Sequence, residues 1–137
     1  MKIEFRAKKI LSPLFRFEYF DEQKAELRRR QLGLQDEEVP CGIYTNEEES
    51  EPKSIVVTTK GLHLLGISAP RFIPYISIVG IGTPTKDPAD TTLHVELVDG
   101  SRVALAITGR EGRLKDIFEF LRFLRRVTDA GTLMEPQ

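Results

Sequence analysis

The residues able to carry nucleophilic or metal chemistry are few and scattered along the chain. There are two histidines, His63 and His94, and one cysteine, Cys41. Both histidines lie in alternating strand patterns, on the side predicted to face solvent, and Cys41 reads as a small buried apolar residue. No motif joins a serine or cysteine nucleophile to a histidine and an acid, and zinc or calcium spacing is absent. The residue types predict a non-catalytic protein without a metal or other cofactor.

A loop rich in glycine and arginine is best suited to bind an anion. Gly109 and Gly112 stand between a predicted strand and a predicted helix. Backbone amides at a helix N-terminus can face an anion, with Arg110, Arg113 and Lys115 beside it. The spacing matches neither a Walker loop nor a dinucleotide fingerprint, and an ordinary strand-to-helix turn explains the glycines equally well. Arg110, Arg113 and Lys115 are the candidate anion ligands.

An acidic run in residues 46–53 offers a different kind of contact. Glu47, Glu48 and Glu49 follow one another there, and the run ends in a lysine. Such a run can dock a basic partner, and it can equally be a solvated loop. The three glutamates are candidate interface residues for a protein partner.

Composition and charge describe an ordinary soluble domain. The 137 residues are 40% hydrophobic and 30% charged, with a net charge of −1. This length supports one continuous core, and the charge is too small for a global field that favours nucleic acid or an anionic membrane. A single cysteine fits a reducing compartment. The lack of a long apolar run predicts a cytoplasmic protein.

The charge is nevertheless uneven along the chain. Residues 1–31 hold nine basic and five acidic residues, a net of +4, and residues 32–53 hold one and seven, a net of −6. Such blocks are usually solvated, or they face each other within a fold. Arg28, Arg29 and Arg30 do not follow a recognition-helix pattern, so we expect no nucleic-acid partner.

The first 35 residues mix strand and helix signals. Residues 2–8 alternate apolar with charged side chains, which is typical of a half-exposed strand. Residues 15–20 fit either a strand or a helix. From Asp21 onward the residues favour a helix that Asp21 caps and Gly33 ends.

Further strands are predicted from alternating or β-branched runs. Pro40 lacks a backbone donor, which places the first of these strands at a sheet edge. Asp99 and Gly100 form the turn of the clearest hairpin. The predicted strand regions are 39–44, 55–59, 62–65, 72–81, 93–97 and 103–107.

The chain then switches to helical spacing over residues 114–127. Phe120, Phe123 and Val127 lie beside the main apolar stripe and widen the apolar arc to roughly 220°. An open sheet covers about half of such an arc. Either the aromatic residues 15–20 or a second copy, in a homodimer, must cover the rest. Phe120, Phe123 and Val127 are therefore candidate interface residues.

Four stretches follow one another in an order that resembles a known family. They are residues 55–62 (IVVTTKGL), 72–78 (FIPYISI), 97–100 (LVDG) and the helix at 114–127. In this order, residues 39–128 resemble a pleckstrin-homology-like domain, the broad group that includes bacterial PH and GRAM-type domains.

The resemblance implies an α+β, mainly β fold within a single domain. It implies a twisted antiparallel sandwich or partial barrel, capped by the C-terminal helix. Residues 1–35 are then an N-terminal elaboration with strand and helix, and residues 129–137 are a tail.

Domains of this group bind phospholipid head groups, peptides or protein surfaces, and they are rarely enzymes. Lipid-binding members use lysines and arginines in the loop between the first two strands. Here that loop is the acidic run 46–53, which repels a phosphate. We therefore expect a non-catalytic module that binds a protein or peptide, either on the edge of the strand at 39–44 or against the C-terminal helix.

Two alternatives stay open. The basic N-terminal segment, with Arg110 and Arg113, could hold the protein to an anionic membrane, with Phe15, Phe17 and Phe20 at the interface. A pocket with converging polar groups would instead favour small-molecule binding or a minor enzymatic role.

Overall fold

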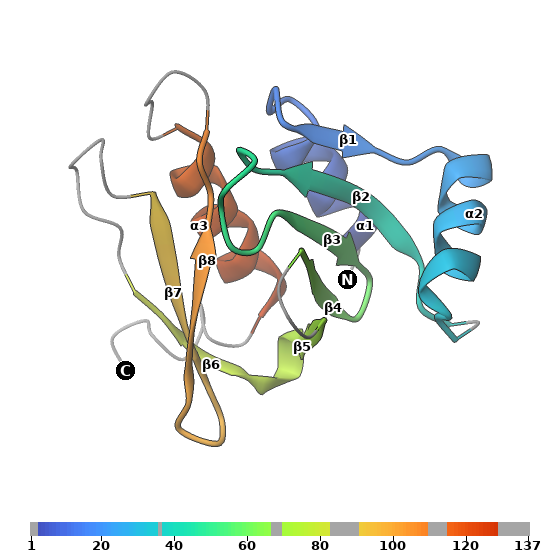
Figure 1. Cartoon of the computed structure of the whole chain (residues 1–137). Coiled ribbons are helices and arrows are strands. Elements are labelled where there is room, and N and C mark those ends of the chain that lie inside the picture. The colour runs from blue at the N-terminus through green and yellow to red at the C-terminus, as the bar shows by residue number, and fades with distance from the viewer. Residues whose placement is uncertain (1–2, 36, 67–69, 83–90, 110–114, 129–137) are drawn as a thin grey trace.

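The computed structural model describes residues 3–35, 37–66, 70–82, 91–109 and 115–128 (Figure 1). Its strands form two antiparallel sheets, and a C-terminal helix follows the second sheet. The predicted α+β, mainly β fold class is therefore confirmed. The five-stranded sheet has the order β1-β2-β3-β4-β5, and the three-stranded sheet has the order β6-β7-β8. The elements are α1 (Ile3–Arg6), the π-helical turn η1 (Ala7–Leu11), β1 (Phe17–Tyr19), α2 (Glu22–Leu32), β2 (Pro40–Thr45), β3 (Ser54–Thr58), β4 (Gly61–Leu65), β5 (Arg71–Pro74), the 3₁₀ turn η2 (Tyr75–Ser77), β6 (Ile78–Ile81), β7 (Thr92–Leu97), β8 (Arg102–Ala106) and α3 (Lys115–Val127).

The hairpin of β7 and β8 matches its prediction closely. Both strands alternate buried with exposed residues, and Leu93, Val95 and Leu105 are buried in the core. Gly100 in the connecting turn has a φ of 90°, a left-handed conformation that favours glycine. Alternation and turn chemistry were thus sufficient to define this hairpin.

Residues 3–11 are helical, which corrects the strand predicted over residues 2–8. The short helix α1 continues directly into η1. Ala7 and Leu11 are fully buried at helical spacing, whereas Phe5, on the same predicted strand face as Ala7, is 53% exposed. The short run of apolar and charged residues was compatible with the spacing of a strand and with that of a helix. Packing of α1 and η1 against α3 favours the helix.

The helix α2 begins and ends as predicted. The Asp21 side chain accepts a hydrogen bond from the Lys24 amide at 2.8 Å, and Gly33 ends the helix with a φ of 67°. None of its residues is buried, and it lies beside β2 at the outside of the molecule (Figure 1). Its formation therefore relies on local signals more than on core packing.

The strand β2 lies inside the five-stranded sheet, which corrects its predicted edge position. It pairs with β1, where Tyr44 lies opposite Phe17, and with β3 on its other side. Pro40 is compatible with this position because the pairing with β1 extends only to Gly42. A Cβ atom at Gly42 would clash with the Phe17 ring, so glycine permits the close approach of β1. A partner strand therefore has no open edge at β2.

The N-terminal segment supplies the cover that α3 requires. Phe120 and Phe123 are completely buried. Their rings pack edge-on against Tyr44 and Tyr75, with centroids 5.4 and 6.2 Å apart. On the outer side, α1 and η1 lie against α3, rather than the predicted residues 15–20. No second copy is needed to bury these two rings.

Candidate functional site

The predicted anion ligands are only partly described. Arg110 and Arg113 lie outside the described residues, and Lys115 is exposed on the first turn of α3. Just before them, the Gly109 amide donates to the Tyr44 hydroxyl at 3.0 Å. That amide is used inside the fold, and anion binding by this loop stays a prediction.

A buried hydrogen bond connects the same region to α3. The Tyr44 hydroxyl donates to Oδ2 of Asp116 at 2.6 Å, and Asp116 is itself buried. Burial, followed by the hydrogen bond and charge of Asp116, raises the pKa of Tyr44. The hydroxyl therefore stays protonated and holds β2 to the start of α3.

The glutamates of the acidic run are exposed. Glu47 lies 3.6 Å from Arg16 and Glu48 lies 3.6 Å from Lys53, while Glu49 is exposed beside them. Exposed ion pairs of this kind contribute little to stability. A role of the three glutamates in partner docking stays a prediction.

Asn46 fixes the position of this run. Its Nδ2 donates to the carbonyls of Pro52 at 2.9 Å and Ala106 at 2.6 Å, and its Oδ1 accepts from the Thr108 amide at 2.9 Å. The side-chain amide thus forms hydrogen bonds with a carbonyl and an N–H group at the end of β8, as the backbone of a neighbouring strand would. The acidic run is held at the end of β2 that is far from residue 38.

Phe120 and Phe123 are core residues, which corrects their assignment as candidate interface residues, and the same assignment for Val127 stays a prediction. The first two are fully buried, and Val127 is partly buried against the same core cluster. Cys41 is also buried, and burial raises the pKa of its thiol to about 12. Its thiol is therefore protonated near neutral pH, as expected for a small core residue.

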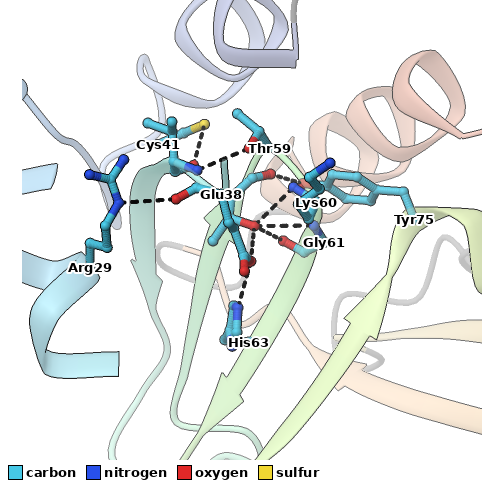
Figure 2. Close-up of polar contacts among 10 residues, drawn as sticks. Arg29, Glu38, Cys41, Thr59, Lys60, Gly61, His63 and Tyr75 are labelled. Carbon is cyan, nitrogen blue, oxygen red and sulfur yellow. Dashed lines mark hydrogen bonds and ion pairs between the residues drawn. The ribbon is translucent and has the colours of Figure 1, made fainter. Parts of the chain in front are cut away.

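The polar group best placed for binding is the carboxylate of Glu38, just before β2 (Figure 2). Its Oε2 accepts the Thr58 hydroxyl at 2.6 Å and Nε2 of His63 at 2.8 Å. Glu38 is only 9% exposed. Two donors on one oxygen fix the orientation of this carboxylate, provided that Nε2 carries the ring proton.

Thr58 is set in place by the turn between β3 and β4. Its hydroxyl oxygen accepts the amides of Lys60 and Gly61, each at 3.1 Å. Its single proton is directed to Glu38 at 2.6 Å rather than to the Gly61 carbonyl at 3.2 Å. A Cβ atom at Gly61 would clash with the backbone of Ile73, so glycine permits the close approach of β5 at the start of β4.

Further hydrogen bonds brace the backbone around Glu38. Nε of Arg29, from α2, donates to the Glu38 carbonyl at 3.3 Å, and the Val39 amide donates to the Thr59 hydroxyl at 3.0 Å. The Tyr75 hydroxyl donates to the Thr58 carbonyl at 2.8 Å, and burial raises the pKa of Tyr75, which keeps it a donor. Figure 2 shows these residues converging from α2, β2, the β3–β4 turn and η2.

An open pocket of about 550 Å³ lies beside this cluster. Phe72 is 40% exposed and Ile76 is 92% exposed, so both present apolar surface to it. The inner side of the Phe72 ring lies against His63, with centroids 4.4 Å apart. We call this the Glu38 pocket. It is lined by Gln35, Glu37, Glu38, Lys60, Phe72, Pro74 and Ile76.

The geometry of the Glu38 pocket suits binding better than nucleophilic catalysis. The Thr58 hydroxyl gives its proton to Glu38 and accepts two amides, so it is not poised to attack a substrate. No three metal-ligating side chains gather within the part of the chain that the structure describes. What remains is a braced carboxylate beside exposed apolar surface.

Sequence reasoning did not identify the Glu38 pocket. Glu38 and His63 are 25 positions apart, and Phe72 joins them only through the pairing of β4 with β5. Thr58 fell at the end of the strand predicted over 55–59, where nothing in the sequence indicated that its hydroxyl would hold a carboxylate. Comparisons with protein-family models, curated proteins and solved structures gave no match to this chain.

Proposed function

We propose that this chain is a non-catalytic interaction module that binds a segment of a protein or peptide in the Glu38 pocket. The observation that carries the proposal is the exposure of Phe72 and Ile76 beside a carboxylate held by two hydrogen bonds. Full burial of an isoleucine or phenylalanine contributes about 1.5–3 kcal/mol. A partner that covers these side chains therefore gains affinity from surface that is otherwise left to water.

The order of elements supports a binding role. Four strands, β2 to β5, are followed by three strands, β6 to β8, and then by α3. This order fits the resemblance to pleckstrin-homology-like domains, whose members mostly bind other molecules. A fold of this kind does not by itself select the ligand, so the proposal rests on the pocket.

The partner is expected to dock through side chains more than through an added strand. β5 is an edge strand of the first sheet, and the Tyr75 amide donates to the Lys60 carbonyl across to β4. Because backbone polar groups alternate in direction along a strand, those of Phe72 and Pro74 point away from β4. Pro74 has no N–H, and its carbonyl already accepts the Ser77 hydroxyl at 2.7 Å. This edge offers few backbone partners, whereas the side-chain pocket beside it is open.

The test is selection of a random-peptide phage library on the whole protein. We expect recovered peptides to bind the wild type and to lose about tenfold or more in affinity to the F72S/I76S double variant. V98S removes a side chain that is 72% exposed on the β7–β8 turn, and it serves as the matched control. Recovery of no peptide, or equal binding to F72S/I76S, would contradict the proposal.

We propose peripheral association with an anionic membrane as a second candidate function, on a different surface. The exposed side chains of α3 fall on one stripe, and α1 and η1 lie against this helix. No helix in the described part of the chain is long and apolar enough to cross a membrane. We call the exposed side of these helices the helical face. Its exposed side chains are Glu4, Phe5, Lys8, Lys9, Lys115, Phe118, Arg122, Arg125 and Arg126.

This surface differs from the one expected from the sequence. Phe17 and Phe20 are buried, so they are not available to an interface, while Phe15 is 70% exposed. Phe5 and Phe118 are partly exposed among the cations of the helical face. Exposed aromatic rings among basic side chains favour adsorption to anionic lipid. Sedimentation with anionic vesicles tests this candidate.

A further inference from the structure

We propose that the Glu38 pocket selects a partner segment in which a lysine or arginine stands directly beside an apolar side chain. This inference rests on the proposed function and adds the chemistry of the partner. It follows from one open oxygen of Glu38, from the charge of the pocket and from its apolar wall.

The open oxygen is Oε1 of Glu38. Both hydrogen bonds to this carboxylate end on Oε2. Among the described residues, no donor forms a hydrogen bond to Oε1. Every buried side-chain oxygen of these residues has a hydrogen-bond partner, so Oε1 is not fully buried and solvent reaches it. Because Glu38 lines the pocket, this oxygen is available to a donor that enters it.

The carboxylate is already oriented before a partner arrives. Thr58 and His63 hold one oxygen, and Arg29 holds the backbone of the same residue. A donor that binds Oε1 therefore does not have to order this side chain, which reduces the entropic cost of binding. A hydrogen bond between a cation and a carboxylate contributes about 1.5–3 kcal/mol.

The charge of the pocket favours a cation. Glu37 and Glu38 contribute two negative charges and Lys60 one positive charge, which leaves a formal net charge of −1 among the lining residues. Glu37 is exposed, and no ion pair of Lys60 occurs among the described contacts. An incoming ammonium or guanidinium group is therefore attracted, and Lys60 opposes it. An incoming carboxylate would meet two like charges.

The apolar wall accounts for the neighbouring residue. One side of the Phe72 ring faces His63, and the ring remains 40% exposed. The alkyl stem of a lysine or arginine can lie along this ring, with a cation–π contribution of about 0.5–1 kcal/mol. Pro74 and Ile76 line the same pocket and provide apolar surface for an adjacent side chain.

The single open oxygen also predicts how the binding affinities of lysine and arginine compare at this pocket. Arginine exceeds lysine where its two nitrogens bind both oxygens of one carboxylate. At Glu38 one oxygen is already used by Thr58 and His63, so a bidentate contact is blocked. We therefore expect lysine and arginine to bind with affinities within about threefold of each other.

Phage selection supplies the first arm of the test. We expect recovered peptides to be enriched in lysine or arginine next to an apolar residue, and depleted in acidic residues. Enrichment of uncharged or acidic peptides that still depend on Phe72 and Ile76 would overturn this inference and leave the proposed function standing. Recovery of no peptide would instead refute the proposed function.

Two matched substitutions supply the second arm, measured by calorimetry with one recovered peptide and its Lys→Gln analogue. E37Q removes an exposed charge in the pocket, and E49Q removes an exposed charge at the opposite end of β2. We expect E37Q to weaken the lysine peptide about threefold while leaving its glutamine analogue unchanged, and E49Q to change neither. Weakening by E49Q without weakening by E37Q would move the basic segment to the acidic run and overturn the inference.

Discussion

The two charged regions of this molecule are built in different ways. Residues 17–65, with α2 and most of the five-stranded sheet, carry ten acidic and six basic side chains among their described residues, a net of −4. The helices α1, η1 and α3 carry three acidic and seven basic side chains, a net of +4. The overall charge of −1 conceals this separation.

The regions also differ in how their charges are held. In the sheet region, Thr58 and His63 fix the Glu38 carboxylate. On the helical face, Arg122 forms an ion pair with the half-buried Glu119 at 3.3 Å. A fixed charge beside apolar surface favours selective binding, whereas exposed charges favour attraction that salt weakens. We therefore expect selective binding at the sheet region and salt-sensitive attraction at the helical face.

The largest expected effect is a difference in the loss of stability between substitutions on the buried side and on the exposed side of α3. F120A removes a fully buried ring that packs against Tyr44, and we expect it to lower the free energy of unfolding by about 3–5 kcal/mol. F118A, on the exposed side, should lower it by less than about 1.5 kcal/mol. Urea denaturation measures both. Equal losses would show that α3 does not divide into a core side and a surface side.

The next effect concerns the cations of the helical face. R122Q/R125Q/R126Q removes three charges, and at about 1 kcal/mol each we expect about a hundredfold weaker adsorption to vesicles containing phosphatidylserine. K24Q/K53Q/K60Q makes the same change of charge in the sheet region and should have little effect. Vesicle sedimentation at low salt measures the difference. Equal weakening by both triples, or no adsorption of the wild type, would contradict a localised basic surface.

A smaller effect tests the brace of the Glu38 pocket. T58A leaves Oε2 of Glu38 without one donor and the amides of Lys60 and Gly61 without their acceptor, so we expect a loss of about 1–3 kcal/mol in stability. T58S keeps the hydroxyl and should lose about 1 kcal/mol or less. Thermal or urea unfolding compares them. Similar losses from both variants would indicate that the methyl group, rather than the hydroxyl, stabilises this turn.

The smallest effect concerns the opposing charge in the pocket. K60Q removes the cation among the described residues that line it, and we expect affinity for a lysine-containing peptide to increase about twofold to fivefold. The Lys→Gln analogue of that peptide should show no increase. Calorimetry at low and physiological salt measures both peptides. Weaker binding of the lysine peptide would mean that Lys60 supports the partner rather than opposing it.

Local patterns predicted those parts of the fold that local interactions determine. Asp21 caps α2, and Gly100 sits in a left-handed turn of the β7–β8 hairpin, as their residue types indicated. The strand predicted over 2–8 was wrong because its short alternation also fits a helix, which packing against α3 favours. Pro40 suggested an edge, but β2 lies inside the sheet; Pro40 pairs with Thr58 of β3, and the short β1 ends its pairing at Gly42.

The Glu38 pocket depended on contacts that no local pattern contains. Glu38 precedes β2, Thr58 ends β3, and His63 meets Phe72 through the pairing of β4 with β5. Sequence reasoning placed His63 on the solvent side of a strand, but gave no sign that a carboxylate from 25 positions away would reach it. The sequence showed a basic block at 1–31 and an acidic block at 32–53, but in the fold α2 joins the acidic region and α3 supplies cations from the far end of the chain. The pocket, in turn, required the register of the sheet.

Titration of the ¹⁵N-labelled protein with a peptide recovered by phage selection tests most directly whether a partner binds in the Glu38 pocket. We expect amide shifts to concentrate at Lys60, Phe72 and Ile76, around this pocket. We also expect these shifts to vanish in F72S/I76S and to persist in V98S. Shifts confined to residues 46–53 or to α3 would contradict the assignment of partner binding to this pocket.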